Sequence, residues 1–134
     1  MPWASVDSKG QGSERRGVVG NLVYIALGGA LGSVARALVG MAVAFPGGTL
    51  TVNVLGSFLI GVAFAAGFAE RSTLHAFVML GFLGGFTTFS TFSLDVLKLV
   101  QAGQGQAAFG YVLVSVLFSI GACAFGFFVA GRFA

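Results

Sequence analysis

Four long apolar runs, separated by short polar segments, dominate the hydrophobic pattern of the chain. The runs cover residues 18–45, 49–69, 74–100 and 107–131, and each reaches the roughly 20 residues that an α-helix needs to cross a bilayer. Proline, paired glycine or polar residues lie between them, as is typical of turns. We therefore predict an all-α membrane protein with four transmembrane helices, in a single domain over residues 18–134, with both termini on one side. Residues 1–17 are polar and are predicted to form a disordered N-terminal tail.

The third run is long for one span, and its middle has a composition that disfavours a helix. Gly84 and Gly85 are followed by six residues, 86–91, of which four carry hydroxyl groups. Glycine is a poor helix former, and hydroxyls compete for backbone partners. Unwound backbone at membrane depth is tolerated where protein encloses it or where it lines a wet cavity. We predict that the third helix is broken at mid-membrane; the alternative is a glycine kink whose hydroxyls bond their own helix.

The composition excludes an ordinary water-soluble domain. Hydrophobic residues make up 57% of the chain and charged residues 8%, whereas soluble domains carry about a quarter charged residues. One cysteine, Cys123, and one histidine, His75, allow neither an intrachain disulfide nor a cysteine metal cluster. The sequence has no nucleophile–base set that would indicate an enzyme, and its net charge of +3 does not indicate nucleic-acid binding. Gly28 and Gly32 have the spacing of a closely packed helix pair.

The distribution of basic residues gives a weak orientation signal. Five lie on the predicted side of the termini and two on the other: Lys9, Arg15, Arg16, Arg71 and Arg132 against Arg36 and Lys98. Basic residues favour the cytoplasmic side, so the termini are expected there. The difference is small enough that insertion in both orientations is possible.

Two sets of polar residues fall inside the predicted spans. Asn53, with Ser57 one turn further on, is either interhelical glue or a donor that lines a pore. Tyr111, Ser115 and Ser119 recur every four residues and form one polar stripe on the fourth helix. The stripe is either a helix contact or a path for a polar solute, and hydroxyl donors without formal charge suit an anion.

Aromatic and charged residues add three further signals. Phe89 and Phe92, three residues apart, share a helix face, and they either pack or present their positive ring edges to an anion. Asp95 and Lys98 lie near the end of the third run, while the other three runs lack Asp and Glu, which favours passive anion conduction over a proton-driven pump. Arg36 either caps helix carbonyls or attracts anions at an entrance.

Three segments resemble the CrcB/Fluc family of fluoride channels: residues 28–36, 48–56 and 81–93, the last being the most specific. The resemblance covers about residues 28–119. It implies an antiparallel, dual-topology homodimer in the cell inner membrane or plasma membrane, with two fluoride pores and a structural sodium ion between the subunits. It also implies a function, the passive export of fluoride, that lowers fluoride toxicity in the cytoplasm.

The resemblance also implies roles for individual residues. Asn53 would line the pore, and Phe89 and Phe92 would meet fluoride with their ring edges. The polar track would comprise the hydroxyl residues Ser90, Thr91, Tyr111, Ser115 and Ser119. The carbonyls of Gly84 and Thr87 would hold the sodium ion. Asp95 is a departure, because many relatives have glutamate after the signature, and its shorter side chain reduces the reach of the carboxylate.

Two other functions remain open from the sequence. A small-multidrug-type four-helix exporter would have a similar size, but the first helix lacks the embedded glutamate that such a transporter needs. In a non-conducting membrane assembly subunit, the polar stripes would only join helices.

Overall fold

The computed structural model describes residues 8–67 and 72–132, with side chains from residue 19 on. This part of the chain is helical, and four stretches are long and apolar enough to cross a membrane: Val19–Ala42, Gly47–Ala65, Thr73–Gln101 and Gly105–Gly131. The elements in chain order are α1 (Ser8–Ala42), α2 (Gly47–Ala65), α3 (Thr73–His75), the π-helix η1 (Ala76–Leu83), α4 (Gly84–Phe86), α5 (Phe89–Gln101) and α6 (Gly105–Gly131). The prediction of an all-α protein with four membrane-spanning passes is confirmed.

Several helix ends differ from those expected. The helix α1 begins at Ser8, so residues 8–17 are helical where the sequence predicts a disordered tail; residues 1–7 lie outside the described part. Ser72 caps the third pass by accepting a hydrogen bond from the His75 amide. The second helix, expected from residue 49, already begins at Gly47, and the Thr49 hydroxyl bonds Asp95 of another helix.

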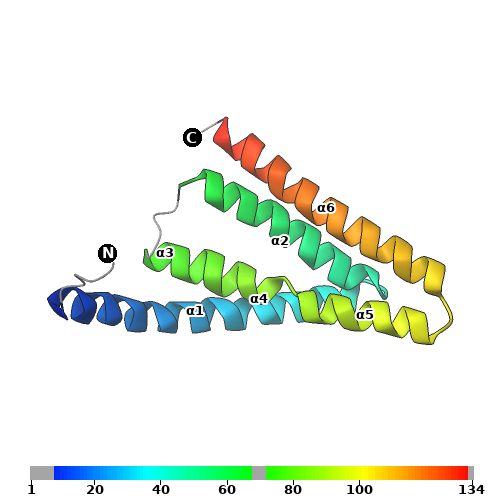
Figure 1. Ribbon diagram of the computed structural model, residues 1–134, viewed down its shortest axis with the longest axis horizontal. Coiled ribbons are helices and arrows are strands. Elements are labelled where there is room, and N and C mark those ends of the chain that lie inside the picture. The colour runs from blue at the N-terminus through cyan, green and yellow to red at the C-terminus, as the bar shows by residue number, and fades with distance from the viewer. Residues whose placement is uncertain (1–7, 68–71, 133–134) are drawn as a thin grey trace, which may run out of the picture.

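The four passes run alternately in opposite directions and form two pairs (Figure 1). The first helix, α1, lies along η1 and α4 of the third pass, and α2 lies along α6. The helix α5 extends the third pass and packs against the start of α6. The first described residues of α1 and the end of α6 lie at the same end of the molecule, as four antiparallel passes require.

Glycines allow the backbones of α1 and η1 to touch. A methyl group at Gly28 or Gly32 would overlap the carbonyl oxygens of Phe77 and Phe82, respectively. The close packing predicted from the spacing of the two glycines is therefore confirmed. The η1 segment is a π-helix, whose turns are wider than those of an α-helix. Short π-helical segments are frequent at functional sites.

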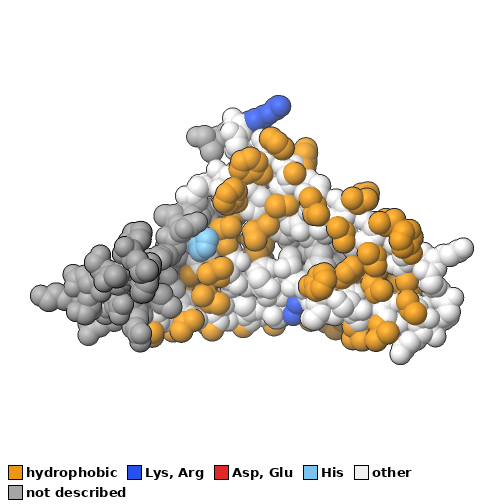
Figure 2. All heavy atoms as spheres, viewed as in Figure 1, with side chains coloured by type: hydrophobic (Ala, Val, Ile, Leu, Met, Phe, Trp, Pro, Cys, Tyr) orange, Lys and Arg blue, Asp and Glu red, His pale blue; other side chains and the backbone are white. Residues whose placement is uncertain are grey.

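The surface of the chain is apolar on every pass. Figure 2 shows hydrophobic side chains spread along the visible face. The buried cluster is small and consists of Phe92, Leu99, Ala108 and Tyr111 where α5 meets α6. So little burial and so much exposed apolar surface would be unstable in water and fit a protein surrounded by lipid or by a second copy.

Candidate functional site

The third pass leaves the helical conformation at two residues. Thr87 and Thr88 are extended, with φ/ψ of −82°/157° and −156°/119°. The Thr87 amide still donates to the Leu83 carbonyl, at 3.0 Å, and therefore completes the last helical turn before the break. The Thr88 hydroxyl accepts a hydrogen bond from the Thr91 amide and caps α5. The chain thus ends one helix and starts another within two residues.

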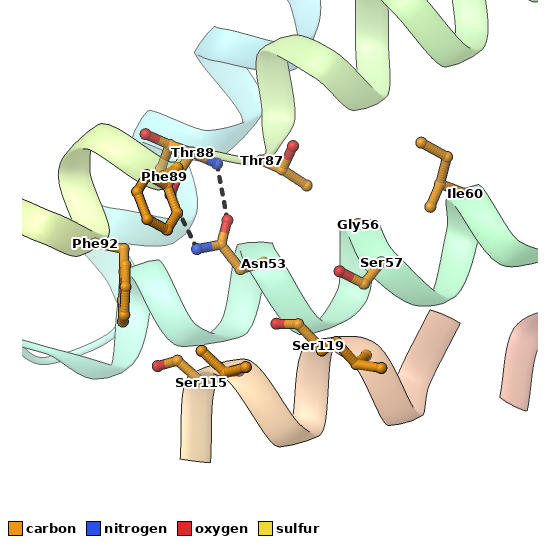
Figure 3. Close-up of a pocket in the computed structure, with 12 residues that line it drawn as sticks. Asn53, Gly56, Ser57, Ile60, Thr87, Thr88, Phe89, Phe92, Ser115 and Ser119 are labelled. Carbon is orange, nitrogen blue, oxygen red and sulfur yellow. Dashed lines mark hydrogen bonds between the residues drawn. The ribbon is translucent and has the colours of Figure 1, made fainter. Parts of the chain in front are cut away.

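Asn53 of α2 holds this extended segment (Figure 3). The Thr88 amide donates to Asn53 Oδ1 at 2.8 Å, and Asn53 Nδ2 donates to the Thr88 carbonyl at 3.0 Å. The carboxamide therefore pairs with both backbone groups of one residue, as a neighbouring strand would. The sequence leaves open whether Asn53 bonds a neighbouring helix or lines a pore, and the structure shows the interhelical hydrogen bonds. Because Nδ2 carries two hydrogens, one donor is left over from this pair.

Arg36 reaches the same segment from α1. Its Nη1 donates to the Thr87 carbonyl at 3.1 Å across 51 residues of chain. A charged donor on a carbonyl makes a strong hydrogen bond. Of the two roles considered for Arg36, capping carbonyls or attracting anions at an entrance, the structure thus shows the contact with a carbonyl.

A cavity of about 380 Å³ lies beside the extended segment, between α2, α5 and α6. The residues that line it combine apolar groups with neutral polar groups: Asn53, Gly56, Ser57, Ile60, Thr87, Thr88, Phe89, Phe92, Ser115, Val116, Ser119 and Ile120. Figure 3 shows Asn53 and the hydroxyl groups of Ser115 and Ser119 in this region, with the Phe89 and Phe92 rings at one side. None of the residues in this lining set is charged. The cavity offers hydrogen-bond donors without a fixed charge.

The two phenylalanines differ in burial. Their ring centroids are 5.5 Å apart, but Phe92 is 8% exposed and packs on Tyr111, while Phe89 is 78% exposed. A large aromatic ring at the rim of a cavity with most of its surface uncovered is available to a second surface. Phe92 therefore contributes to the core as well as to the cavity.

Three of the predicted pore residues, Ser90, Thr91 and Tyr111, lie outside the cavity lining. Ser90 and Thr91 are exposed, and their hydroxyls bond the Thr88 hydroxyl at 3.3 and 3.0 Å. Tyr111 and Ser115 are buried, and their hydroxyl oxygens have no hydrogen-bond partner among the described residues. Two unpaired buried hydroxyls on one face of α6 are costly unless water or an ion completes them.

Sequence reasoning missed one buried polar pair, which lies near the stripe. Asp95 is 3% exposed and accepts a hydrogen bond of 2.6 Å from the Thr49 hydroxyl. Lys98 Nζ lies 3.8 Å from the same carboxylate and also over the Phe45 ring. Thr49 and Asp95 are 46 residues apart, so no local pattern could have joined them.

Comparisons with known proteins place these features in a family. The family described as "CrcB-like protein, Camphor Resistance (CrcB)" matches residues 23–127, which is most of the chain. The chain is 48% identical over 111 residues to the fluoride-specific ion channel FluC of Nitrobacter winogradskyi, covering 75% of this chain and 87% of that protein. It is 45% identical over 117 residues to the FluC of Hahella chejuensis, with 81% and 92% covered. For the FluC of Saccharophagus degradans the identity is 50% over 107 residues, with 73% and 80% covered.

The matched region includes the second and third passes entirely, most of the first and fourth, and every residue that lines the cavity. Both the family match and the identities extend over far more than a local motif. The chain belongs to the CrcB-like family of membrane proteins.

Proposed function

We propose that the chain is a subunit of a fluoride-selective channel that passively exports fluoride and so lowers its toxicity in the cytoplasm. The observation that carries the proposal is the cavity of neutral donors and aromatic rings beside the extended Thr87–Thr88 segment. The relatives that bear the name fluoride-specific ion channel match this chain over most of its length.

The cavity suits a small anion for a physical reason. An unpaired ion in a low-dielectric interior costs on the order of tens of kcal/mol, so every water that is lost must be replaced. The free Nδ2 hydrogen of Asn53 and the hydroxyls of Ser115 and Ser119 can donate to fluoride. The ring edges of Phe89 and Phe92 carry partial positive charge and can add weak contacts. Because none of these groups carries a fixed charge, fluoride can also leave.

The pore of this proposal is completed between two copies of the chain in an antiparallel, dual-topology homodimer. The exposed Phe89 ring at the rim of the cavity supports a second surface there. The small difference in basic residues between the two sides supports insertion in both orientations. Two such copies would form two equivalent pores in the cell inner membrane or plasma membrane.

The extended segment lies at mid-membrane depth in this arrangement. Thr87 is the central residue of the 29-residue span Thr73–Gln101. The Thr88 amide, which would bond the Gly84 carbonyl in a continuous α-helix, donates to Asn53 instead. Carbonyls released in this way are typical ligands of sodium in broken membrane helices. The residues therefore fit a structural sodium ion held between the copies by the Gly84 and Thr87 carbonyls.

Survival of cells on fluoride tests the function. Expression of the chain in a bacterium that lacks its own fluoride exporter should restore growth on fluoride, and the variant N53D should not. Continued sensitivity with the protein inserted in the membrane would exclude the proposed export. An exporter of organic cations or an assembly subunit would leave fluoride sensitivity unchanged.

A further inference from the structure

The contact between Arg36 and the Thr87 carbonyl brings a fixed positive charge to an oxygen that the proposed sodium site also uses. The guanidinium lies 3.1 Å from this oxygen and is partly buried. Gly85 of α4 packs against the backbone of Gly29, which brings α1 close enough for this contact. The Arg36 side chain is thus held at the break by tight helix packing.

The extended segment is satisfied from within one chain. Asn53 pairs with the amide and the carbonyl of Thr88, and Arg36 pairs with the carbonyl of Thr87. An unsatisfied backbone group in the membrane interior is strongly unfavourable. The hydrogen bonds that Asn53 and Arg36 make allow the break to form without an ion on the Thr87 carbonyl.

We propose that Arg36 sets the affinity of the sodium site by placing a positive charge on the same Thr87 carbonyl that the ion would bind. A carbonyl oxygen has two lone pairs, so a guanidinium and a sodium ion can share it. The two positive charges then lie close together in a medium of low dielectric and repel each other. Without the guanidinium, the Thr87 carbonyl would also lose its hydrogen-bond partner. The sodium-free state would then be less stable, which favours sodium binding. Both effects make sodium bind more tightly when Arg36 is neutralised.

The inference rests on the sodium site within the proposed function, and its main measurement, thermal stability in sodium, does not depend on fluoride conduction. The purified protein is heated in increasing sodium chloride, with N-methylglucamine chloride keeping the ionic strength constant. The sodium concentration that gives half of the stabilisation is compared between the wild type, R36M and R36K. We expect this concentration to fall by about tenfold in R36M, because the repulsion is removed, and to stay near the wild-type value in R36K.

A control separates the local contact from the general charge of the protein. K98M removes a positive charge that pairs with Asp95 instead of the break, and it should leave the sodium response unchanged. Should R36M fail to fold, R36Q keeps an N–H donor without the charge and is expected to show the same tenfold fall.

An unchanged or higher half-saturating sodium concentration in the neutral variants would overturn the proposal that Arg36 weakens sodium binding. A lack of stabilisation by sodium in all variants would exclude the sodium site itself. Fluoride flux measured on the same sample would then show whether the protein conducts without such a site.

Discussion

At the residue scale, two side chains from other helices decide the shape of the third pass. Asn53 and Arg36 supply partners to Thr88 and Thr87, whose backbone groups leave the helical pattern. The same Asn53 carboxamide lines the cavity. In the proposed channel, this single residue would position the backbone and also contact the permeating ion.

The substitution N53D tests both roles of Asn53. The carboxylate cannot donate to the Thr88 carbonyl, and it places a negative charge beside the anion path. We expect fluoride flux to fall by about a hundredfold, since an unmatched buried acceptor costs about 1–3 kcal/mol before charge repulsion is added. Ser57 lines the same cavity one turn along α2, so S57A is the matched control and should change flux only slightly. Unchanged flux in N53D would exclude a role for Asn53 in the pore.

Phe89 allows a test of the ring edge without loss of the core. F89L keeps an apolar side chain but removes the aromatic edge at a position that is 78% exposed. We expect fluoride flux to fall by about fivefold, as an aromatic contact of about 1 kcal/mol predicts, with the melting temperature unchanged. F109L, at an exposed position on α6 outside the cavity lining, should conduct normally. Equal flux in both variants would exclude a role for the Phe89 ring.

At the element scale, the passes approach one another through glycine. Alanine at Gly32 would collide with the backbone of η1 and α4, which cannot move aside as a flexible side chain could. We expect G32A to lower the free energy of unfolding by about 1–3 kcal/mol in detergent. Gly40 lies on the same helix with open space around its Cβ position, so G40A should be neutral or slightly stabilising. Equal stability of the two variants would mean that the α1–η1 contact can relax.

The sequence predicts the elements better than their junctions. The four spans follow from apolar length, which depends only on the bilayer. The two extended residues could not be located within residues 81–93, because the choice depends on the bonds of Asn53 to Thr88. The hydrogen bond from Thr49 to Asp95 could not be predicted either, because it joins residues 46 positions apart in the chain. The helix over residues 8–17 has no apolar pattern that would indicate it.

At the scale of the whole molecule, the single chain leaves much apolar surface uncovered. The passes form two pairs with exposed apolar residues on each, and a phenylalanine of the cavity rim is uncovered. In the proposed dimer, a second copy in the opposite orientation would cover part of this surface and complete the proposed pore.

Labelling of a single engineered cysteine tests the two orientations. Gln104 lies in the exposed turn between α5 and α6, and Cys123 can be replaced to leave Q104C as the only thiol. With dual topology, a thiol reagent that cannot cross the membrane should label about half of the molecules in intact cells, because neither side has a decisive excess of basic residues. Complete labelling or none would show a single orientation.

Ion flux from vesicles tests the central claim most directly. Purified protein is reconstituted into vesicles loaded with potassium fluoride or potassium chloride, and efflux is followed with ion-selective electrodes after valinomycin is added to carry the potassium. A passive fluoride channel should release fluoride rapidly once potassium can follow, without a proton gradient or a second substrate, while chloride stays inside. Retention of fluoride by folded protein, or release of chloride at the same rate, would contradict the account.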